Sequence, residues 1–386
     1  MKSPKLSGVL GLLLLLGISL PGHTAPLIIP APPTIPAKGY LLVDYDSGRV
    51  LVSEKADERM EPASITKMMT TYIISSELRN GNIKLDDKVR ISEKAWRAPG
   101  SRMFVEVNTD VSVEDLLRGI IVQSGNDATI ALAEYVSGTE QAFVSTMNQY
   151  AKMLGMKNTH FVNSTGLPHK DHYSSATDLA TLARAMIRNF PEHYAWYAEK
   201  EFTYNKIKQY NRNRLLWRDK SVDGIKTGHT ESAGYCLVAS ARRNNMRLIS
   251  VVLGATSQSA REKATLTLLN YGFRFYETQK LHSGSSTLVS SDLWKSESDS
   301  IAMGLKDDLY ITSPRGQFKR IKTTIRYDSY IIAPINKGQR LGTVTLTLAG
   351  KEIATRPLVA LHDAKEGSLW STIIDTIKLF FIKLFS

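Results

Sequence analysis

The sequence predicts an α+β protein: an antiparallel sheet with a cluster of helices, then a small all-β domain, then a C-terminal amphipathic helix. Strand-like runs occur both before and after a block of helical runs, so strands distant in the chain are expected to share one sheet. After about Gln279 the chain changes to serine clusters and short alternating runs, which are typical of β structure. Residues 367–386 repeat large apolar side chains at helical spacing.

Length, charge and cysteine content narrow the class of protein. The chain has 386 residues, of which 42% are hydrophobic, so it is long and apolar enough for about two folded domains. A formal net charge of +12 suits nucleic acid, an anionic membrane or an anionic polymer. The chain has no zinc-ligand spacing and no aromatic-basic nucleotide platform, so no nucleic-acid partner is predicted. The single cysteine, Cys236, lies in an apolar run and is expected to be a small core residue.

The N-terminus has the layout of a secretion signal, predicted over residues 1–25. Lys2 and Lys5 precede an apolar run, Val9–Leu20, and small residues follow. The run is shorter than the ~20 residues of a spanning helix, which favours cleavage over an uncleaved anchor. The proline-rich residues 26–38 are expected to be a linker.

Residues 39–279 are expected to form the larger domain. Two short apolar runs, Tyr40–Asp44 and Val50–Glu54, flank the turn sequence Asp46-Ser47-Gly48 and predict a hairpin. Pro62 opens a helix that Asn80-Gly81 ends. The remaining predicted elements are helices at 113–122, 127–136, 142–154 and 176–187, a hairpin at 234–241 and 247–254, and a helix at 260–273.

The C-terminal part is predicted as a small β domain over 280–362 and an amphipathic helix over 367–386. Charges in that helix argue against spanning a bilayer, whereas its aromatic residues and lysines favour the membrane interface. The alternative is a helix docked on the protein's own core. Its large apolar residues are Leu369, Trp370, Ile373, Ile374, Ile377, Phe380, Phe381, Leu384 and Phe385.

Three short motifs carry the predicted chemistry: Ser64-Ile65-Thr66-Lys67, Ser124-Gly125-Asn126 and Lys226-Thr227-Gly228. Each alone is weak evidence. All three occur in this order, each at a fitting element boundary, behind a signal peptide. The trio is a known pattern of penicillin-recognising serine enzymes.

The residue types in the first motif suit nucleophilic catalysis. A serine hydroxyl needs a base to take its proton, and Lys67 lies one helical turn from Ser64, on the same face. A lysine is a base only if burial or a second cation lowers its pKa, and Lys226 would be that cation.

The other two motifs suit substrate contact and proton transfer. Ser124, at a break between helices, can pass a proton between Lys67 and the leaving group. Asn126 can hydrogen-bond a substrate amide or hold Lys67 in place. The Lys-Thr-Gly motif is expected to open a strand whose edge pairs with an extended peptide. There Gly228 would let the substrate approach, and Lys226 and Thr227 would bind a terminal carboxylate.

Three segments that contain the motifs, Pro62–Thr70, Gln123–Ala128 and Val222–Thr230, resemble the low-molecular-mass penicillin-binding proteins that act as serine-type D-alanyl-D-alanine carboxypeptidases. The likeness runs from Tyr40 to the C-terminus and implies a serine β-lactamase/transpeptidase-like domain over residues 39–279. It implies that Ser64 is acylated, that Lys67 is its base and that Ser124 shuttles protons. The implied substrate-binding residues are Asn126, Lys226, Thr227, Gly228, His229 and Arg261, with the backbone N–H groups of Ser64 and His229 as the oxyanion hole.

The resemblance implies an enzyme that removes the terminal D-alanine from peptidoglycan pentapeptide stems and is acylated by β-lactam antibiotics, with roles in cell-wall maturation and shape. It implies no cofactor and no metal. The expected location is the periplasmic face of the bacterial inner membrane, reached by export and held by residues 367–386. The stretch Asn163–Pro168 departs from the best-known membrane-tethered members, which bears on substrate preference.

Three other interpretations of the sequence are less well supported than this one: a β-lactamase, a non-catalytic protein and a metal site. A class A β-lactamase needs a glutamate to activate the deacylating water, and none occurs between His160 and Asp178. A non-catalytic wall-binding protein would tolerate loss of Ser64 or Lys67, yet both are present. The run His169-Lys170-Asp171-His172 offers metal-ligand side chains but is predicted to be a solvated loop.

Overall fold

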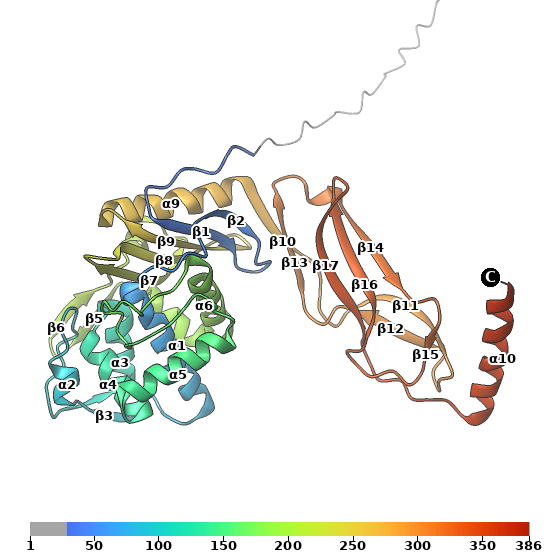
Figure 1. Ribbon diagram of the computed structural model, residues 1–386, viewed down its shortest axis with the longest axis horizontal. Coiled ribbons are helices and arrows are strands. Elements are labelled where there is room, and N and C mark those ends of the chain that lie inside the picture. Colours follow the sequence, from blue (N-terminus) through green and yellow to red (C-terminus); the bar gives the residue numbers. More distant parts are fainter. Residues whose placement is uncertain (1–28, 386) are drawn as a thin grey trace, which may run out of the picture.

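The computed structural model describes residues 29–385, so the predicted signal peptide lies outside the described residues. Figure 1 shows two units along the long axis of the molecule, with the last helix at the end distant from the first unit. The first unit contains a mixed sheet-and-helix core and the second is built from strands, in agreement with the predicted α+β class.

The first unit is built on a five-stranded antiparallel sheet with strand order β2-β1-β9-β8-β7. Both predicted hairpins are confirmed as adjacent strand pairs. The strand β7 lies at one edge of this sheet, and among residues 29–385 no strand pairs with its other side. The strands are β1 (Gly39–Asp44), β2 (Val50–Glu54), β7 (Val222–Thr230), β8 (Gly234–Arg243) and β9 (Met246–Ala255).

Both faces of this sheet are buried, which explains why its three central strands, β1, β8 and β9, are largely apolar. Successive residues point to opposite faces of a strand. Leu41 and Val43 in β1 pack into the cluster that contains α1 (Lys67–Asn80), α4 (Asn126–Ser137) and α6 (Ala176–Asn189). Tyr40 and Leu42 pack into a second cluster that contains α9 (Gln258–Phe275). The sheet is therefore the middle layer of three.

The helical layer begins with a 3₁₀ helix, η1 (Ala63–Thr66), that runs directly into α1 (Lys67–Asn80). Gly81, at φ 75°, ends α1 in the left-handed conformation that favours glycine. The other helices are α2 (Glu93–Trp96), α3 (Val113–Arg118), α4 (Asn126–Ser137), α5 (Glu140–Met153), α6 (Ala176–Asn189), α7 (Pro191–Tyr194), η3 (Ala195–Ala198) and α8 (Leu215–Arg218). Two small antiparallel sheets pair β3 (Lys88–Arg90) with β4 (Asp110–Ser112) and β5 (Glu201–Tyr204) with β6 (Ile207–Tyr210).

The predicted single helix at 113–122 is wrong in one respect. Only α3 is α-helical, and a π-helical turn, η2 (Gly119–Gln123), follows it. Such turns occur often at functional sites, because the extra residue changes the direction of the chain.

The second unit has its own apolar core around Ile301, Met303 and Leu346, all fully buried. Its main sheet has the order β14-β16-β17-β12-β11-β15, and β10 pairs separately with β13. The strands are β10 (Tyr276–His282), β11 (Thr287–Trp294), β12 (Ser300–Gly304), β13 (Leu309–Pro314), β14 (Ile321–Tyr327), β15 (Ile331–Ile332), β16 (Arg340–Leu348) and β17 (Lys351–Ala360), and η4 (Phe318–Arg320) precedes β14.

Side-chain hydrogen bonds join the two units where β10 follows α9. The Thr278 hydroxyl donates to the buried Asp44 carboxylate at 2.7 Å. The hydroxyls of Ser47 and Thr312 are 2.6 Å apart, and Arg49 donates to the Thr312 carbonyl at 2.7 Å. The turn between β1 and β2 thus contacts β13 directly.

The final helix, α10 (Leu369–Phe385), exposes most of its apolar side chains to solvent, whereas Leu379 is buried. Trp370 is 77% exposed and Phe380 is 63% exposed. The Asp375 carboxylate on this helix accepts a hydrogen bond from the Lys295 backbone N–H at 2.8 Å. Within residues 29–385, none of the helices combines the length and the apolar character needed to cross a bilayer.

Candidate active site

The predicted site residues gather at a cleft of about 270 Å³ between η1, the turn after η2, β7 and α9. Six of them line it: Ser64, Ser124, Thr227, Gly228, His229 and Arg261. The other three, Lys67, Asn126 and Lys226, are buried next to these in the sequence or one turn from them. Four lining residues were not predicted: Ser101, Arg212, Tyr235 and Gln258.

Ser64 and Lys67 are in direct contact. The Lys67 Nζ lies 2.9 Å from the Ser64 Oγ and donates to the Thr165 carbonyl at 2.7 Å. The Lys67 side chain is fully buried. Burial, and then the nearby Lys226 ammonium, hold the pKa of Lys67 well below its ordinary value, against the opposing charge of Asp127. A neutral amine beside a serine hydroxyl can accept its proton.

Ser124 follows the π-helical turn and has φ 66°, the left-handed conformation. Its Oγ is buried and has no hydrogen-bond partner among the described residues. The neighbouring Asp127 carboxylate fixes this turn by accepting from the backbone N–H groups of Met103 and Phe104 at 3.0 and 2.9 Å. The hydroxyl of Ser124 is therefore held in place and free to bond a reacting group.

Asn126 is 4% exposed and begins α4. Its amide Nδ2 donates to the Pro99 carbonyl at 2.5 Å, and its Oδ1 has no partner among the described residues. The buried oxygen is thus available to an incoming donor, such as a substrate N–H.

The Lys-Thr-Gly motif lies inside the edge strand β7, which begins at Val222, rather than opening a strand as the sequence suggested. Burial, and then Arg212 and Arg261, lower the pKa of Lys226 to about 7. A Cβ on Gly228 would meet the Pro62 carbonyl at 2.7 Å. Glycine at 228 therefore lets β7 pack against the helix that carries Ser64, a reason that the sequence did not reveal.

Arg261 and His229 complete the cleft. Arg261 is only 4% exposed, so it is not an ordinary surface arginine, and its Nε has no partner among the described residues. The His229 ring packs against the Tyr235 ring with centroids 4.0 Å apart. Three cationic side chains, Arg212, Lys226 and Arg261, thus lie around one end of the cleft.

The loop between α5 and α6, which contains the stretch Asn163–Pro168, also reaches the site through the Thr165 carbonyl. The Asn163 Oδ1 accepts hydrogen bonds from the backbone N–H groups of Thr165, Gly166 and Leu167 at 3.2, 2.7 and 3.2 Å. Gly166 has φ +85°, and a Cβ there would lie 1.9 Å from the Ala63 carbonyl. The Asn-Ser-Thr-Gly turn sequence was the available signal, but nothing in it indicated which helix the loop would contact.

The solvated-loop interpretation of residues 169–172 is wrong for His172, which is 2% exposed. Its Nδ1 accepts from the Val162 N–H at 3.2 Å, so the Nε2 carries the proton and donates to the Thr66 hydroxyl at 2.8 Å. Burial, and then the charges of His160, His169 and Lys67, lower the pKa of His172 to about 4. This neutral imidazole fastens the loop to the start of α1.

We expect His172 to make the stability of the fold pH-dependent. An unfolded histidine binds a proton below about pH 6.5, whereas the folded one stays neutral down to about pH 4. The contribution is therefore present above pH 6.5 and is lost as pH falls toward 4, by up to about 3 kcal/mol. Urea unfolding of wild type and His172→Gln at pH 7 and 4.5 measures it. His362→Gln, at an exposed position after β17, is the control, and an equal pH dependence in all three proteins would contradict the assignment.

A serine bonded to a buried lysine, on an α+β scaffold with an unpartnered serine hydroxyl opposite, defines a serine acyl-transfer enzyme of the penicillin-recognising class. Residues 27–257 match the family model for D-alanyl-D-alanine carboxypeptidase, and residues 276–366 match that for the C-terminal domain of penicillin-binding protein 5. The chain belongs to the D-alanyl-D-alanine carboxypeptidase family and is a hydrolase. The predicted family, enzyme class and fold class are confirmed.

Named relatives resemble the chain over most of its length. It is 45% identical over 362 residues to D-alanyl-D-alanine carboxypeptidase DacA of Escherichia coli K12, covering 92% of this chain and 90% of the relative. The DacA of Haemophilus influenzae is 46% identical over 358 residues, or 90% and 91% of the two chains. The crystal structure of penicillin-binding protein 5 from Haemophilus influenzae superposes with a TM-score of 0.84 at 45% identity, covering 87% of this chain and 99% of that one.

Proposed function

We propose that this carboxypeptidase removes the terminal D-alanine from peptidoglycan pentapeptide stems through an ester on Ser64. The neutral Lys67 amine takes the Ser64 proton as the Oγ attacks the carbonyl between the last two D-alanines. The Ser124 hydroxyl then relays this proton from Lys67 to the departing nitrogen, so D-alanine leaves with a neutral amino group. Water then hydrolyses the ester by the reverse proton route. The observation that carries this proposal is the 2.9 Å contact between the Ser64 Oγ and the buried Lys67 Nζ.

Substrate placement follows from the edge strand and the cationic end of the cleft. The free side of β7 can pair with the extended peptide. Lys226, Thr227 and Arg261 would bind the terminal carboxylate, since a carboxylate pairs well with buried cations. Asn126 would accept a substrate N–H, and the backbone N–H groups of Ser64 and His229 would stabilise the oxyanion.

The same arrangement supports slow-turnover acylation by β-lactams. A β-lactam presents a strained amide and a carboxylate in the positions of the D-alanyl-D-alanine terminus, so penicillin would acylate Ser64. The absence of a glutamate between His160 and Asp178 argues against rapid deacylation of the class A type. The test is intact-mass measurement after exposure to penicillin, paired with D-alanine release from a pentapeptide muropeptide. Rapid penicillin turnover without D-alanine release would indicate a β-lactamase instead.

We further propose that the enzyme is exported and that α10 holds it on the surface of the bacterial inner membrane, facing the periplasm. The helix exposes one tryptophan and three phenylalanines to solvent: Trp370, Phe380, Phe381 and Phe385. Its polar side is engaged, because Asp375 bonds the backbone of the β domain. An amphipathic helix of this kind binds the lipid interface by burying its apolar side.

Deleting residues 369–386 is expected to abolish binding to anionic phospholipid vesicles while leaving D-alanine release within about twofold of wild type, because α10 lies far from β7 and α9, which border the cleft, in Figure 1. Vesicle flotation and muropeptide hydrolysis measure the two properties. A matched substitution, Lys378→Gln, keeps the apolar side and should retain flotation at high vesicle concentration. Flotation of the deletion variant would contradict the anchor.

A further inference from the structure

The Thr165 carbonyl sets the orientation of the Lys67 amine. A neutral amine has two hydrogens and one lone pair, and all three rotate together about the Cε–Nζ bond. When one N–H donates to the Thr165 carbonyl at 2.7 Å, the lone pair can face the Ser64 Oγ at 2.9 Å. Loss of that carbonyl would let the amine rotate, and fewer molecules would present the lone pair to Ser64. The position of Thr165 therefore matters for the proton transfer.

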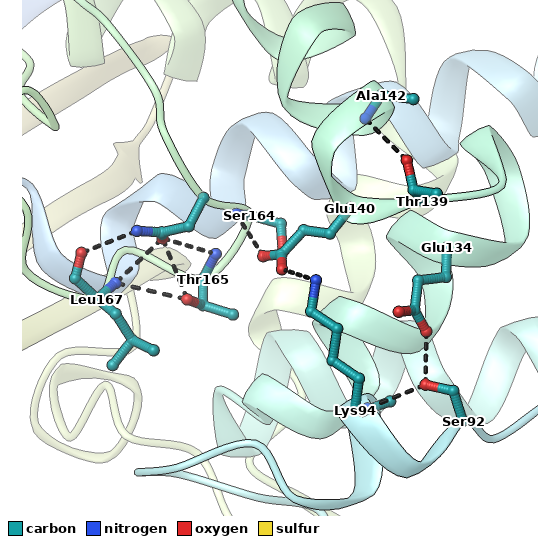
Figure 2. Close-up of polar contacts among 11 residues, drawn as sticks. Ser92, Lys94, Glu134, Thr139, Glu140, Ala142, Ser164, Thr165 and Leu167 are labelled. Atoms are coloured by element: carbon teal, nitrogen blue, oxygen red, sulfur yellow. Dashed lines mark hydrogen bonds and ion pairs between the residues drawn. The ribbon is translucent and has the colours of Figure 1, made fainter.

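Residue 164, next to Thr165, is held from two sides. Its carbonyl accepts from the Thr70 hydroxyl on α1 at 2.8 Å. Its backbone N–H and its hydroxyl both donate to Glu140 Oε1, at 3.1 and 2.7 Å. Ser164 is fully buried, so these bonds do not compete with water. Figure 2 shows the Glu140 side chain reaching from α5 to this loop.

Glu140 is held as a carboxylate. Burial alone would raise its pKa, but the bonds from Lys94 and Ser164 lower the pKa below its usual range. Lys94 on α2 donates to Oε2 at 2.7 Å, from the side opposite Ser164. One carboxylate thus connects α2, α5 and the loop.

We propose that Glu140 is a positioning residue, which holds the Thr165 carbonyl on the Lys67 amine by binding the backbone and hydroxyl of Ser164. This inference rests on the proposed function, in which Lys67 is the base for Ser64. Glu140 touches neither the substrate cleft nor the reacting atoms. Its effect passes through one residue of backbone, from Ser164 to Thr165.

The test compares Glu140→Ala with a matched deletion nearby. Glu134 on α4 also accepts from a serine hydroxyl, that of Ser92 at 2.6 Å, but this bond does not involve the loop. Stopped-flow acylation of Ser64 by a fluorescent penicillin should be about tenfold slower in Glu140→Ala and unchanged in Glu134→Ala. Glu140→Gln keeps an oxygen acceptor for Ser164 and should stay within about threefold of wild type. Lys94→Ala leaves the Glu140–Ser164 hydrogen bonds intact, so its acylation rate should also stay within about threefold of wild type.

The pH profile of acylation separates positioning from general destabilisation. The carbonyl dipole stabilises the Lys67 ammonium more than the amine, so its withdrawal lowers the pKa of Lys67. In Glu140→Ala the rise of the acylation rate with pH should therefore occur at lower pH than in wild type. The maximal rate at high pH should also be lower. The other ionisable groups that face Lys67 are Lys226 on β7, Asp127 on α4 and His172 on the loop, and all remain in every variant. A shift that also occurs in Glu140→Gln would assign the effect to charge and overturn positioning.

Each remaining outcome decides the proposal. Equal acylation rates and equal pH–rate profiles in Glu140→Ala and Glu134→Ala would overturn the positioning role of Glu140. They would leave Lys67 as the base. If Glu140→Ala does not fold, Ser164→Ala, which removes one of the two bonds, should still slow acylation about threefold, and a wild-type rate there would overturn the inference. Failure of the proposed function is distinct, because it would show as fast acylation without Lys67.

Discussion

Replacing Ser64 by alanine is expected to abolish the penicilloyl adduct and to reduce D-alanine release by about 10⁴-fold or more, because the attacking oxygen is removed. The cleft should otherwise persist. Lys67 keeps its bond to the Thr165 carbonyl, and Ser64 contributes only a half-buried hydroxyl to the packing. Intact-mass spectrometry after penicillin treatment measures the adduct directly.

Ser76→Ala is the matched control for this variant. Ser76 lies on the same helix, where its hydroxyl bonds Tyr150 at 3.0 Å, remote from the cleft. That variant should acquire the same mass as the wild type. A stoichiometric adduct on Ser64→Ala would place the nucleophile elsewhere and remove the basis of the mechanism.

Replacing Lys67 by methionine is expected to slow acylation by about 10³-fold or more, because a hydroxyl without a base stays protonated at neutral pH. Methionine suits the test, since it is unbranched, similar in length and apolar, and the site is fully buried. The fold should survive, because residues on both sides of Lys67 pack in the same core, among them Ile65 and Met68. Thermal unfolding confirms the fold, and stopped-flow acylation gives the rate.

The pH dependence of wild-type acylation supplies an independent check on Lys67. Since burial and Lys226 hold the pKa of Lys67 down, the base form is populated at lower pH than for a free lysine. The rate of wild type should rise as pH increases through that pKa and then level off. Lys67→Met should show no such limb, and a variant that acylates within tenfold of wild type would contradict the role of this amine.

Local chemistry explains why much of the fold could be read from the sequence. Turn residues between apolar runs predicted both hairpins, and the three- and four-residue spacing predicted α1, α5, α6 and α9. The π-helical turn Gly119–Gln123 escaped prediction, because its residues have an ordinary helical pattern. The Asp127 carboxylate, which follows that turn, accepts a hydrogen bond from the Met103 backbone N–H, a contact between segments that are apart in the chain.

Seven of the nine candidate site residues belong to the three motifs, and two, His229 and Arg261, come from the family resemblance. The structure brings all nine to one cleft or its immediate wall. Their catalytic roles stay predictions that the variants above test. The sequence did not predict the residues that support the site through tertiary contacts. Glu140, Thr165 and His172 belong to no motif, and each matters only because a distant segment folds against α1.

The sequence by itself determined the order of elements, the family and the pair Ser64 and Lys67, because one helical turn brings two such residues into contact wherever that turn forms. Only the tertiary structure decided that the Lys67 side chain is fully buried and that a carbonyl from the loop at 163–167 orients its amine. It also decided that β7 lies at the edge of the sheet, next to this site. Burial and hydrogen-bond partners depend on segments about a hundred residues away. The pKa of a lysine is therefore a property of the packed fold and not of its motif.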